Sequence, residues 1–492
     1  MIVIFFLAIV TLIYYIRFRH SRKLLYKLSD SLPNIGEVPF LGHSHWFIGG
    51  PERNNIKSLG KKLQLAGDST KIWIGPHLYV VPWNLDDVQN ILENCLEKDS
   101  SYKFLQTWLG NGLFVAPVDL WKKHRRLLLP IFHNRIVEDY IDVFGKQGAL
   151  LVQRLEPQVG QPDFDIHKFI TSCMLDIVFE TAMGEKMDIQ NVNDNPYLQA
   201  RHTVMSIISM RLFKPWLQPD SLFKLTSYAK IQKENIDITH KFTDEVRHKI
   251  LCFILKPAVF SGAPDLLELL IKKNSDFTNE QLREHIDSIT IAGNDTTALV
   301  ISYTILLLGL HQTEQEKVYE ELKAVFGDDK RIPTRDDLYK LNYLERVLKE
   351  TMRLYAVVPI IARKTLKEIK LSTCTLPAGV GCAVLPFIIH RSKTIWGPDA
   401  DDFNPDRFLP ENCAKRHPCA FLPFSFGSRN CIGRHFGMLA MKSVLATVLR
   451  SYKISSQECD RLKIEILLFP VNGHLVSLQK RNENNYNVQL VS

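Results

Sequence analysis

Residues 424–433 read FSFGSRNCIG and lead into an apolar helical run that begins near Phe436. Cys431 lies just before a helix N-terminus, where backbone N–H groups and the helix dipole favour a thiolate. Gly427 permits a turn with positive φ, and Gly433 lets a flat ligand approach the backbone closely. Arg429 can reach an anionic group such as a propionate. A buried cysteine in a glycine-containing turn would explain Cys431 alone but not the whole set, so the stretch predicts a cofactor-binding loop.

The composition is that of an ordinary globular protein. The chain has 492 residues, a net charge of +8, 46% hydrophobic residues and 23% charged residues. The basic excess is spread along the chain, so nucleic-acid binding is not predicted. The nine cysteines form no CxxC pair, which disfavours a disulfide scaffold or a zinc module and favours reduced thiols in a cytosolic domain. The sequence has no GxGxxG or GxxxxGK[ST] phosphate loop, so any reducing equivalents must come from a partner protein.

Residues 1–16 contain no charged side chain, and a basic cluster follows from Arg17 to Lys27. A cleaved signal peptide would carry basic residues before its apolar run and a small-residue cleavage site after it. We therefore predict an uncleaved membrane anchor at 1–16, whose length of about 24 Å is slightly short for a bilayer core. The positive-inside rule puts the following domain in the cytosol. Prolines and glycines up to residue 42 make 17–42 a basic Pro/Gly hinge, and 43–492 form one catalytic domain.

The rest of the chain is predicted to be mainly helical with a small β-rich part. Strand-like stretches occur at 71–81 and 375–385. The clearest helix follows Thr278, which with Gln281 forms a capping-box pattern, and continues to about Leu310. Strands do not alternate regularly with helices, which disfavours a doubly wound nucleotide-binding fold.

The pattern Phe-x-x-Gly-x-Arg-x-Cys-x-Gly, which starts at Phe424, resembles the haem-binding loop of the cytochrome P450 haem-thiolate monooxygenases. The similarity covers essentially the whole chain and implies the cytochrome P450 fold, a single α+β domain that encloses non-covalent haem b. It implies Cys431 as the proximal iron ligand, and a thiolate favours O–O cleavage because it pushes electron density onto iron. It further implies O₂ as co-substrate and a place on the endoplasmic reticulum membrane. NADPH–cytochrome P450 reductase is the implied electron donor, with cytochrome b5 as a second donor.

Glu350 and Arg353 stand three residues apart and are neighbours on one helix face. Alone, such a pair is most often solvent-exposed. In the resembled family it is joined by a later arginine, matched here by Arg407. The resemblance implies a buried triad that holds the loop of Cys431, and such a triad loses much stability when one partner is removed.

The predicted helix carries the sequence AGNDTT at 292–297. Ala292 and Gly293 are small and would make room for O₂ and substrate beside the iron. Thr296 could donate to the carbonyl four residues back and open the helix locally. With Asp295, it resembles the acid–alcohol pair that delivers protons to iron-bound oxygen in the family. The alternative is that these polar residues lie on a solvated helix face.

The run WKKHRR places Trp121 and Arg125 one helical turn apart. By resemblance these two residues bind haem propionates, as does Arg363. The alternative for the run is a solvated basic face, to which we assign Lys122 and Lys123. These lysines could dock an acidic reductase surface, since complementary charge accelerates encounter.

Residues 103–113 and 265–278 resemble family four of the cytochromes P450, the branch known for fatty-acid ω-hydroxylation. The chain departs from that branch twice. Many family-four enzymes esterify a Glu immediately before the helix Gly to the haem, and Ala292 replaces it here, so the haem is predicted to be non-covalent. Ala356-Val357 replaces the usual Pro-Pro. Both departures lie near the expected substrate site, so the lipophilic substrate stays open between a fatty acid, a terpenoid hormone or pheromone, and a xenobiotic.

Candidate substrate contacts are apolar side chains near these motifs, and core packing is the alternative for each. They are Phe104, Leu105, Leu113, Phe114, Val358, Ile360, Ile361, Phe469 and Val471. Two alternatives to monooxygenation stay open: a reductase-independent fatty hydroperoxide isomerase or dehydratase, and a non-catalytic haem-containing lipid-binding protein. Asp295 and Thr296 argue against the first, because its chemistry needs no proton delivery to O₂.

Overall fold

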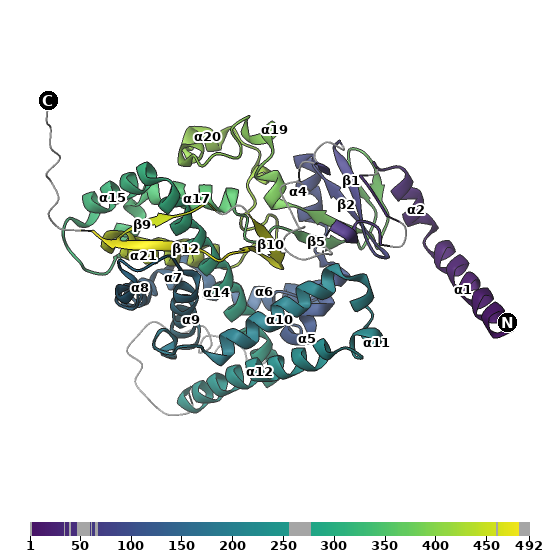
Figure 1. Cartoon of the computed structure of the whole chain (residues 1–492), viewed down its shortest axis with the longest axis horizontal. Coiled ribbons are helices and arrows are strands. Elements are labelled where there is room, and N and C mark those ends of the chain that lie inside the picture. The colour runs from purple at the N-terminus through teal and green to yellow at the C-terminus, as the bar shows by residue number, and fades with distance from the viewer. Residues whose placement is uncertain are drawn as a thin grey trace.

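A 32-residue helix, α14 (Asn279–Leu310), runs through the middle of the computed structural model (Figure 1). Its predicted capping box is confirmed: the Gln281 backbone N–H donates to Thr278 Oγ1, and the Thr278 N–H donates to Gln281 Oε1. All residues from Thr297 to Gly309 are buried. The helix packs against several others, namely α9 (His167–Met183), α12 (Ser227–Ile254), α17 (Asn342–Leu354) and α21 (Arg434–Ser451). The main hydrophobic core therefore forms around α14.

The structure describes residues 2–33, 35–38, 41–46, 60, 62–63, 67–254, 277–458 and 461–481. These residues are mainly helical with small sheets, as predicted. The other helices of eight or more residues are α1 (Ile2–Ser21), α2 (Lys23–Asp30), α4 (Leu85–Asn94), α6 (Val118–Leu128), α8 (Ile141–Leu155), α10 (Pro196–Phe213) and α15 (Gln312–Phe326). The shorter α-helices are α5 (Lys103–Leu109), α7 (Asn134–Glu138), α11 (Asp220–Phe223), α16 (Arg335–Lys340), α18 (Pro386–Ile389), α19 (Lys393–Trp396) and α20 (Pro410–Ala414).

A five-stranded sheet, in the order β1-β2-β8-β5-β3, forms a second part of the molecule. Its strands are β1 (Ser69–Ile74), β2 (His77–Pro82), β8 (Gly381–Val384), β5 (Ile361–Lys364) and β3 (Glu97–Lys98). The β2–β8 pairing is parallel and the others are antiparallel. Residues 71–81 therefore belong to two strands joined by a tight turn. A second hydrophobic cluster lies between this sheet, α4 and α2.

The remaining strands form three small sheets. They are β4 (Phe164–Asp165) with β12 (Leu475–Lys480) and β9 (Tyr452–Ser456), the hairpin β10 (Leu462–Glu465) with β11 (Leu467–Pro470), and β6 (Ile369–Lys370) with β7 (Thr375–Leu376). The β10–β11 hairpin contributes to the pocket described below.

The N-terminal helix α1 projects from the body beyond the five-stranded sheet (Figure 1). Apolar side chains along it are exposed, among them Phe5, Phe6 and Leu12. The helix continues to Ser21, past the predicted anchor boundary at residue 16. The segment 17–42 contains helix α2 instead of being a hinge throughout, because α2 docks on the sheet: Trp73 Nε1 donates to Ser29 Oγ at 3.0 Å.

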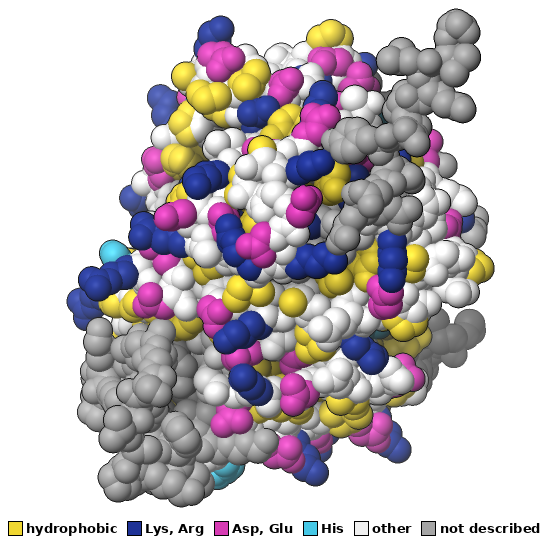
Figure 2. Space-filling view, turned by 90° about the vertical axis from the view of Figure 1, so that its left-hand side faces the viewer, with side chains coloured by type: hydrophobic (Ala, Val, Ile, Leu, Met, Phe, Trp, Pro, Cys, Tyr) yellow, Lys and Arg dark blue, Asp and Glu magenta, His cyan; other side chains and the backbone are white. Residues whose placement is uncertain are grey.

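Within the part of the chain that the structure describes, α14 is the one helix that passes a length-and-hydropathy test for a membrane span. Its most apolar window is 78% buried inside the protein, as expected of a core helix. Lys, Arg, Asp and Glu side chains are interspersed over the face drawn in Figure 2. The described residues on that face therefore form no extended patch of one sign.

Candidate functional site

Cys431 lies in a tight loop before α21, and Gly433 is the residue that precedes the helix. The Cys431 N–H donates to the carbonyl of Phe424 at 2.9 Å and closes the loop. Gly427 has a φ of 74°, and a Cβ there would lie 2.7 Å from the Leu92 carbonyl oxygen, so both backbone and space require glycine. The predicted turn at Gly427 is confirmed, and so is the predicted place of Cys431 just before a helix N-terminus, since α21 begins at Arg434.

The Cys431 thiol is accessible although protein surrounds the loop. Burial raises the pKa of the Cys431 thiol, whereas the Gly433 N–H and the charges of Arg125 and Arg434 lower it. Arg125, on α6, donates to both the carbonyl and Oδ1 of Asn430 at 2.7 Å. Arg125, which the sequence predicts to bind a haem propionate, is therefore hydrogen-bonded to Asn430, the residue before the cysteine.

A cluster of cations lies beside this loop, where β3 pairs with β5. Lys98 and Arg363 are register partners on these strands, and Arg363 is only 1% exposed. The Arg429 guanidinium lies 4.9 Å from the ring centroid of Trp121, and two of its nitrogens donate to the Leu96 and Ala116 carbonyls. Burial and the charges of Arg363 and Arg429 hold the pKa of Lys98 well below its usual range.

These cations fit the carboxylates of a haem. Among the described residues, the buried Nε atoms of Arg363 and Arg429 have no hydrogen-bond partner. Burial, then the charge of Arg363, lowers the pKa of Arg429 to about 10. An anionic ligand would relieve both the unsatisfied donors and the mutual repulsion. The sequence analysis did not identify Lys98, because it belongs to no motif and its two-residue strand has no recognisable pattern.

On α14, the Thr296 hydroxyl donates to the Ala292 carbonyl at 2.7 Å, as predicted. Asp295 instead pairs with Arg201 of α10, with 2.7 Å between Oδ1 and the guanidinium. Burial raises the pKa of Asp295, and the charges of Arg201 and His202 oppose that rise. Sequence reasoning missed Arg201, because nothing in α10 marks it as the partner of a residue almost a hundred positions away.

Ala292 and Gly293 differ in what they face. Ala292 lines the pocket. A Cβ on Gly293 would lie 3.1 Å from Val178 of α9. The small size of Gly293 therefore allows close packing of α14 on α9, and the expectation that it makes room in the pocket is not met.

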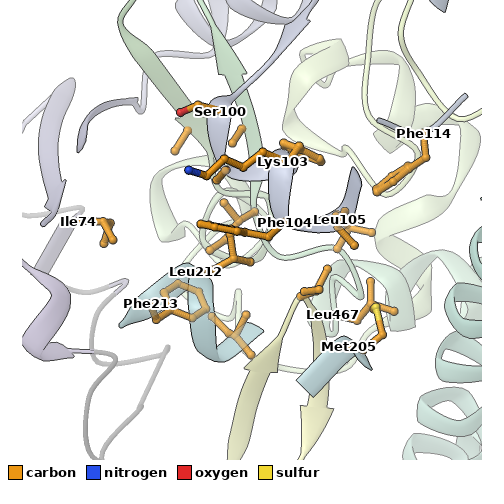
Figure 3. A pocket seen from close by; sticks show the side chains of 18 of the residues that line it. Ile74, Ser100, Lys103, Phe104, Leu105, Phe114, Met205, Leu212, Phe213 and Leu467 are labelled. Atoms are coloured by element: carbon orange, nitrogen blue, oxygen red, sulfur yellow. The ribbon is translucent and has the colours of Figure 1, made fainter. Parts of the chain in front are cut away.

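A pocket of about 250 Å³ lies between α5, α10, α14, the five-stranded sheet and the β10–β11 hairpin (Figure 3). Its lining is mainly apolar, and Thr296 and Ala292 belong to it. Of the predicted contacts, five line it: Phe104, Leu105, Phe114, Val358 and Ile360. Lining residues that sequence reasoning missed include Ile74, Lys103, Met205, Phe213 and Leu467. They come from four separate elements, β1, α5, α10 and β11, which no local pattern links.

Four predicted contacts do not line this pocket. Side chains alternate along β5, so Ala362 faces the pocket while Ile361 packs in the second hydrophobic cluster. Leu113 packs in a third cluster with residues of α6 and α9. The Phe469 ring faces His167 of α9, with centroids 6.0 Å apart, and Val471 lies just beyond the end of β11.

The predicted triad is present and buried. Arg353 donates from Nε and a terminal nitrogen to both carboxylate oxygens of Glu350, at 2.7 and 2.8 Å, and neither side chain is exposed. Arg407 Nε lies 3.6 Å from Glu350 Oε1. Arg353 also donates to the carbonyls of His390 and Asp402. The triad thus ties α17 to the segment 390–407 that precedes the cysteine loop.

Comparison with known proteins shows which families and proteins this chain resembles. The cytochrome P450 family model matches residues 33–478. Cytochrome P450 4c3 of Drosophila melanogaster is 35% identical over 505 residues, which cover 96% of this chain and 93% of that protein. Cytochrome P450 4V2 of Homo sapiens is 35% identical over 432 residues, which cover 84% and 82%. The predicted resemblance to family four is confirmed by these relatives, although residues 265–276 lie outside the described part.

The fold matches solved structures as well. The crystal structure of the cytochrome P450DA heme domain superposes with a TM-score of 0.80 and covers 92% of this chain and 98% of that chain. The sequences are 22% identical. The likeness therefore establishes the fold and nothing further.

Proposed function

This chain belongs to the cytochrome P450 family and is a monooxygenase, and we propose that it inserts one oxygen atom from O₂ into a lipophilic substrate. A haem held by a cysteine thiolate is the family cofactor and would supply the activation of O₂. Ala292 has no carboxyl group with which to form an ester link, in agreement with non-covalent haem. The proposal of a lipophilic substrate rests on one observation. The pocket is mainly apolar, and Ala292 and Thr296 of α14 line it.

We assign the ligand role to Cys431, because its thiol is accessible and it precedes a helix N-terminus. Trp121, Arg125, Arg363 and Arg429 are assigned to the haem propionates, and Lys98 joins them. The support is the unsatisfied, mutually repelling cation cluster described above. Phe424, Gly427 and Gly433 shape the loop.

Asp295 and Thr296 are assigned to proton delivery. Thr296 lines the pocket and can pass a proton from its hydroxyl toward the reacting oxygen. Asp295 precedes it on α14 and is held by Arg201, which orients the carboxylate. Thr296 is then the last proton donor and Asp295 its source.

The substrate is expected to be an amphiphile, which favours a fatty acid over a terpenoid or a neutral xenobiotic. Phe114 lies on one side of the pocket, away from Ile74 (Figure 3). The Lys103 amino group points to the opposite side, toward Ile74 (Figure 3). An anionic head group at Lys103 would leave the alkyl chain against the apolar lining, to which Ala292 and Thr296 of α14 belong.

We further propose that residues 1–16 anchor the enzyme in the endoplasmic reticulum membrane, with the catalytic domain 43–492 in the cytosol. The exposed apolar side chains of α1 support this. NADPH–cytochrome P450 reductase is the proposed electron donor, and cytochrome b5 is a further candidate. Lys122 and Lys123 are exposed on α6, the helix that also carries Trp121, and can meet an acidic donor surface.

The test is the absorption spectrum of the reduced, CO-bound full-length protein, followed by a reductase-coupled screen of lipids. We expect the long-wavelength Soret band of thiolate ligation, its loss in Cys431→Ser, and substrate-dependent NADPH oxidation with a hydroxylated product. Lipid binding without NADPH oxidation would favour a binding protein. Peroxide consumption without reductase would favour a hydroperoxide isomerase. Charge reversal at Lys122 and Lys123 should slow turnover and leave the spectrum unchanged.

A further inference from the structure

We propose that Arg211 of α10 is a positioning residue: it fixes one wall of the substrate pocket and thereby determines which carbon of the bound chain is oxidised. Arg211 is not among the described residues that line the pocket, but it contacts Phe104, which is. The inference deepens the proposed function and rests on it, because it assumes that hydroxylation takes place in this pocket.

Arg211 is packed against two phenylalanine rings. Its side chain is only 2% exposed. The guanidinium carbon lies 4.4 Å from the ring centroid of Phe104 and 3.8 Å from that of Phe223. A planar guanidinium is attracted to the faces of aromatic rings, and the attraction is strongest where water is excluded. Phe104 belongs to α5 and Phe223 to α11, so one side chain of α10 joins both helices.

Hydrogen bonds hold the Arg211 guanidinium in place. Nε donates to the Leu217 carbonyl at 3.1 Å, and a terminal nitrogen donates to Asp220 Oδ1 at 2.6 Å. The hydrogen bond from Arg211 lowers the pKa of Asp220, so the partner is an ionised carboxylate. Leu217 ends a short turn after α10, and Asp220 begins α11. The guanidinium therefore cannot rotate away from Phe104 without losing a charge-assisted hydrogen bond.

The segment that follows Arg211 supplies more of the same wall. Leu212 and Phe213 line the pocket (Figure 3). Beyond them, Pro215 packs on the turn between β1 and β2, since a Cβ on Gly75 would lie 2.8 Å from the Pro215 Cβ. The wall is thus held by apolar packing at that turn and by the Arg211 guanidinium at its other side.

An alkyl chain offers no polar group by which a protein can select one carbon. The shape and rigidity of the pocket walls therefore determine which carbon reaches the reacting oxygen. Phe104 follows Lys103, the proposed contact of the head group, and its ring is part of the lining against which the chain would lie. If the ring could turn, neighbouring carbons would react equally well and the product would become a mixture. Arg211 prevents that turn from outside the pocket.

Another buried arginine provides a matched control. Arg247 of α12 is 8% exposed, and its guanidinium lies 3.2 Å from Asp244 on the same helix. It is not among the described residues that line the pocket. Arg247→Met removes a buried arginine and its ion pair, as Arg211→Met does, but leaves the support of Phe104 in place. A loss of stability alone would affect both variants, whereas the proposed role affects only one.

The test uses the full-length holoenzyme with the reductase and hexadecanoic acid, and it measures kcat, KM and the ratio of the main hydroxylated product to its positional isomers. In Arg211→Met we expect that ratio to fall about tenfold while kcat changes little. Arg211→Lys keeps a cation for Asp220 but has no planar group to contact both rings, so its ratio should fall to a similar extent. Arg247→Met should keep the wild-type ratio.

A double-variant comparison tests the route through Phe104. Phe104→Leu keeps an apolar side chain but removes the ring, so it should lower the product ratio by a factor similar to that in Arg211→Met. The double variant Phe104→Leu/Arg211→Met should be no less selective than either single variant, because both residues act through one ring. Losses that multiply would mean that Arg211 acts elsewhere and would overturn the proposal.

The remaining outcomes are equally decisive. A wild-type ratio in Arg211→Met, full recovery in Arg211→Lys, or an equal loss in Arg247→Met would each overturn the role of Arg211. If Arg211→Met does not fold with haem, Arg211→Lys decides by the same ratio. A wild-type enzyme that binds hexadecanoic acid but forms no hydroxylated product would refute the proposed reaction and this inference with it. One main product that the Arg211 variants retain would refute the inference alone.

Discussion

Arg201 of α10 and Asp295 of α14 form an ion pair with 2.7 Å between the guanidinium and the carboxylate, and their side chains are only 6% and 13% exposed. The pair links a helix that lines the substrate pocket to the proposed proton source. Burial alone would favour the neutral carboxyl, and the charges of Arg201 and His202, both on α10, favour the ionised form. The protonation of Asp295 is therefore set from a different helix.

Removing Arg201 should shift the pH dependence of turnover. Asp295 can supply a proton only while its carboxyl is protonated, so in the wild type the rate should fall as the pH rises through its raised pKa. In Arg201→Met the pKa rises further, and the alkaline limb of the profile moves to higher pH. Arg201→Lys should keep the limb near its original position. Asp295→Asn should lose about a hundredfold in product per NADPH, and an unmoved limb in Arg201→Met would contradict the role.

The buried triad should determine whether the protein holds haem at all. Arg353→Ala leaves the Glu350 carboxylate buried without its main partner, which costs about 3–5 kcal/mol. We expect almost no haem in the purified variant. Arg346→Ala is the matched control on the same helix: its pair with Asp406 is 3.4 Å long and partly exposed, so its loss should cost about 1 kcal/mol or less. Haem content per polypeptide and urea unfolding measure both, and normal occupancy in Arg353→Ala would refute the prediction.

Local sequence patterns were enough to predict much of the fold and about half of the site residues. A capping box, a glycine with positive φ and an acid–base pair at three-residue spacing are each decided within one turn of chain, and all were predictable. Long-range register was not. The sequence shows only that Gly293 is small. The structure shows that its small size allows Val178 of α9 to pack closely against α14.

Lys98 shows the same limit from another side. Its charge is visible in the sequence, yet its meaning depends on the pairing of β3 with β5, which sets it opposite Arg363. Those two strands are more than 250 residues apart in the chain. The prediction of the pocket lining was incomplete for the same reason, because Ile74, Phe213 and Leu467 come together only in the tertiary structure.

Lys98→Met should weaken haem retention. A charge-assisted hydrogen bond contributes about 1.5–3 kcal/mol, so we expect about tenfold or faster haem transfer to apomyoglobin. Lys122→Met, which removes an exposed lysine from α6, should leave the transfer rate unchanged. Without haem, the free energy of unfolding of the wild type should rise with pH between the lowered pKa of Lys98 and its ordinary value, since the unfolded chain binds that proton more tightly. A haem transfer rate equal to that of the wild type would refute the assignment.

Lys103 should govern how an anionic substrate is held. Its amino group lies 5.0 Å from the Phe104 ring centroid, and its charge adds to that of Arg211 in lowering the pKa of Asp220. Lys103→Glu would place a negative charge at the head-group end, so KM for a long-chain fatty acid should rise about tenfold or more. Lys103→Met should raise it less, because it removes attraction without adding repulsion. The methyl ester of the same acid is the internal control, since it carries no charge and its KM should stay constant in both variants. Product analysis adds a second criterion: with the head group released, hydroxylation should spread from the chain terminus to inner carbons. Equal changes for acid and ester would mean that Lys103 acts only on pocket shape.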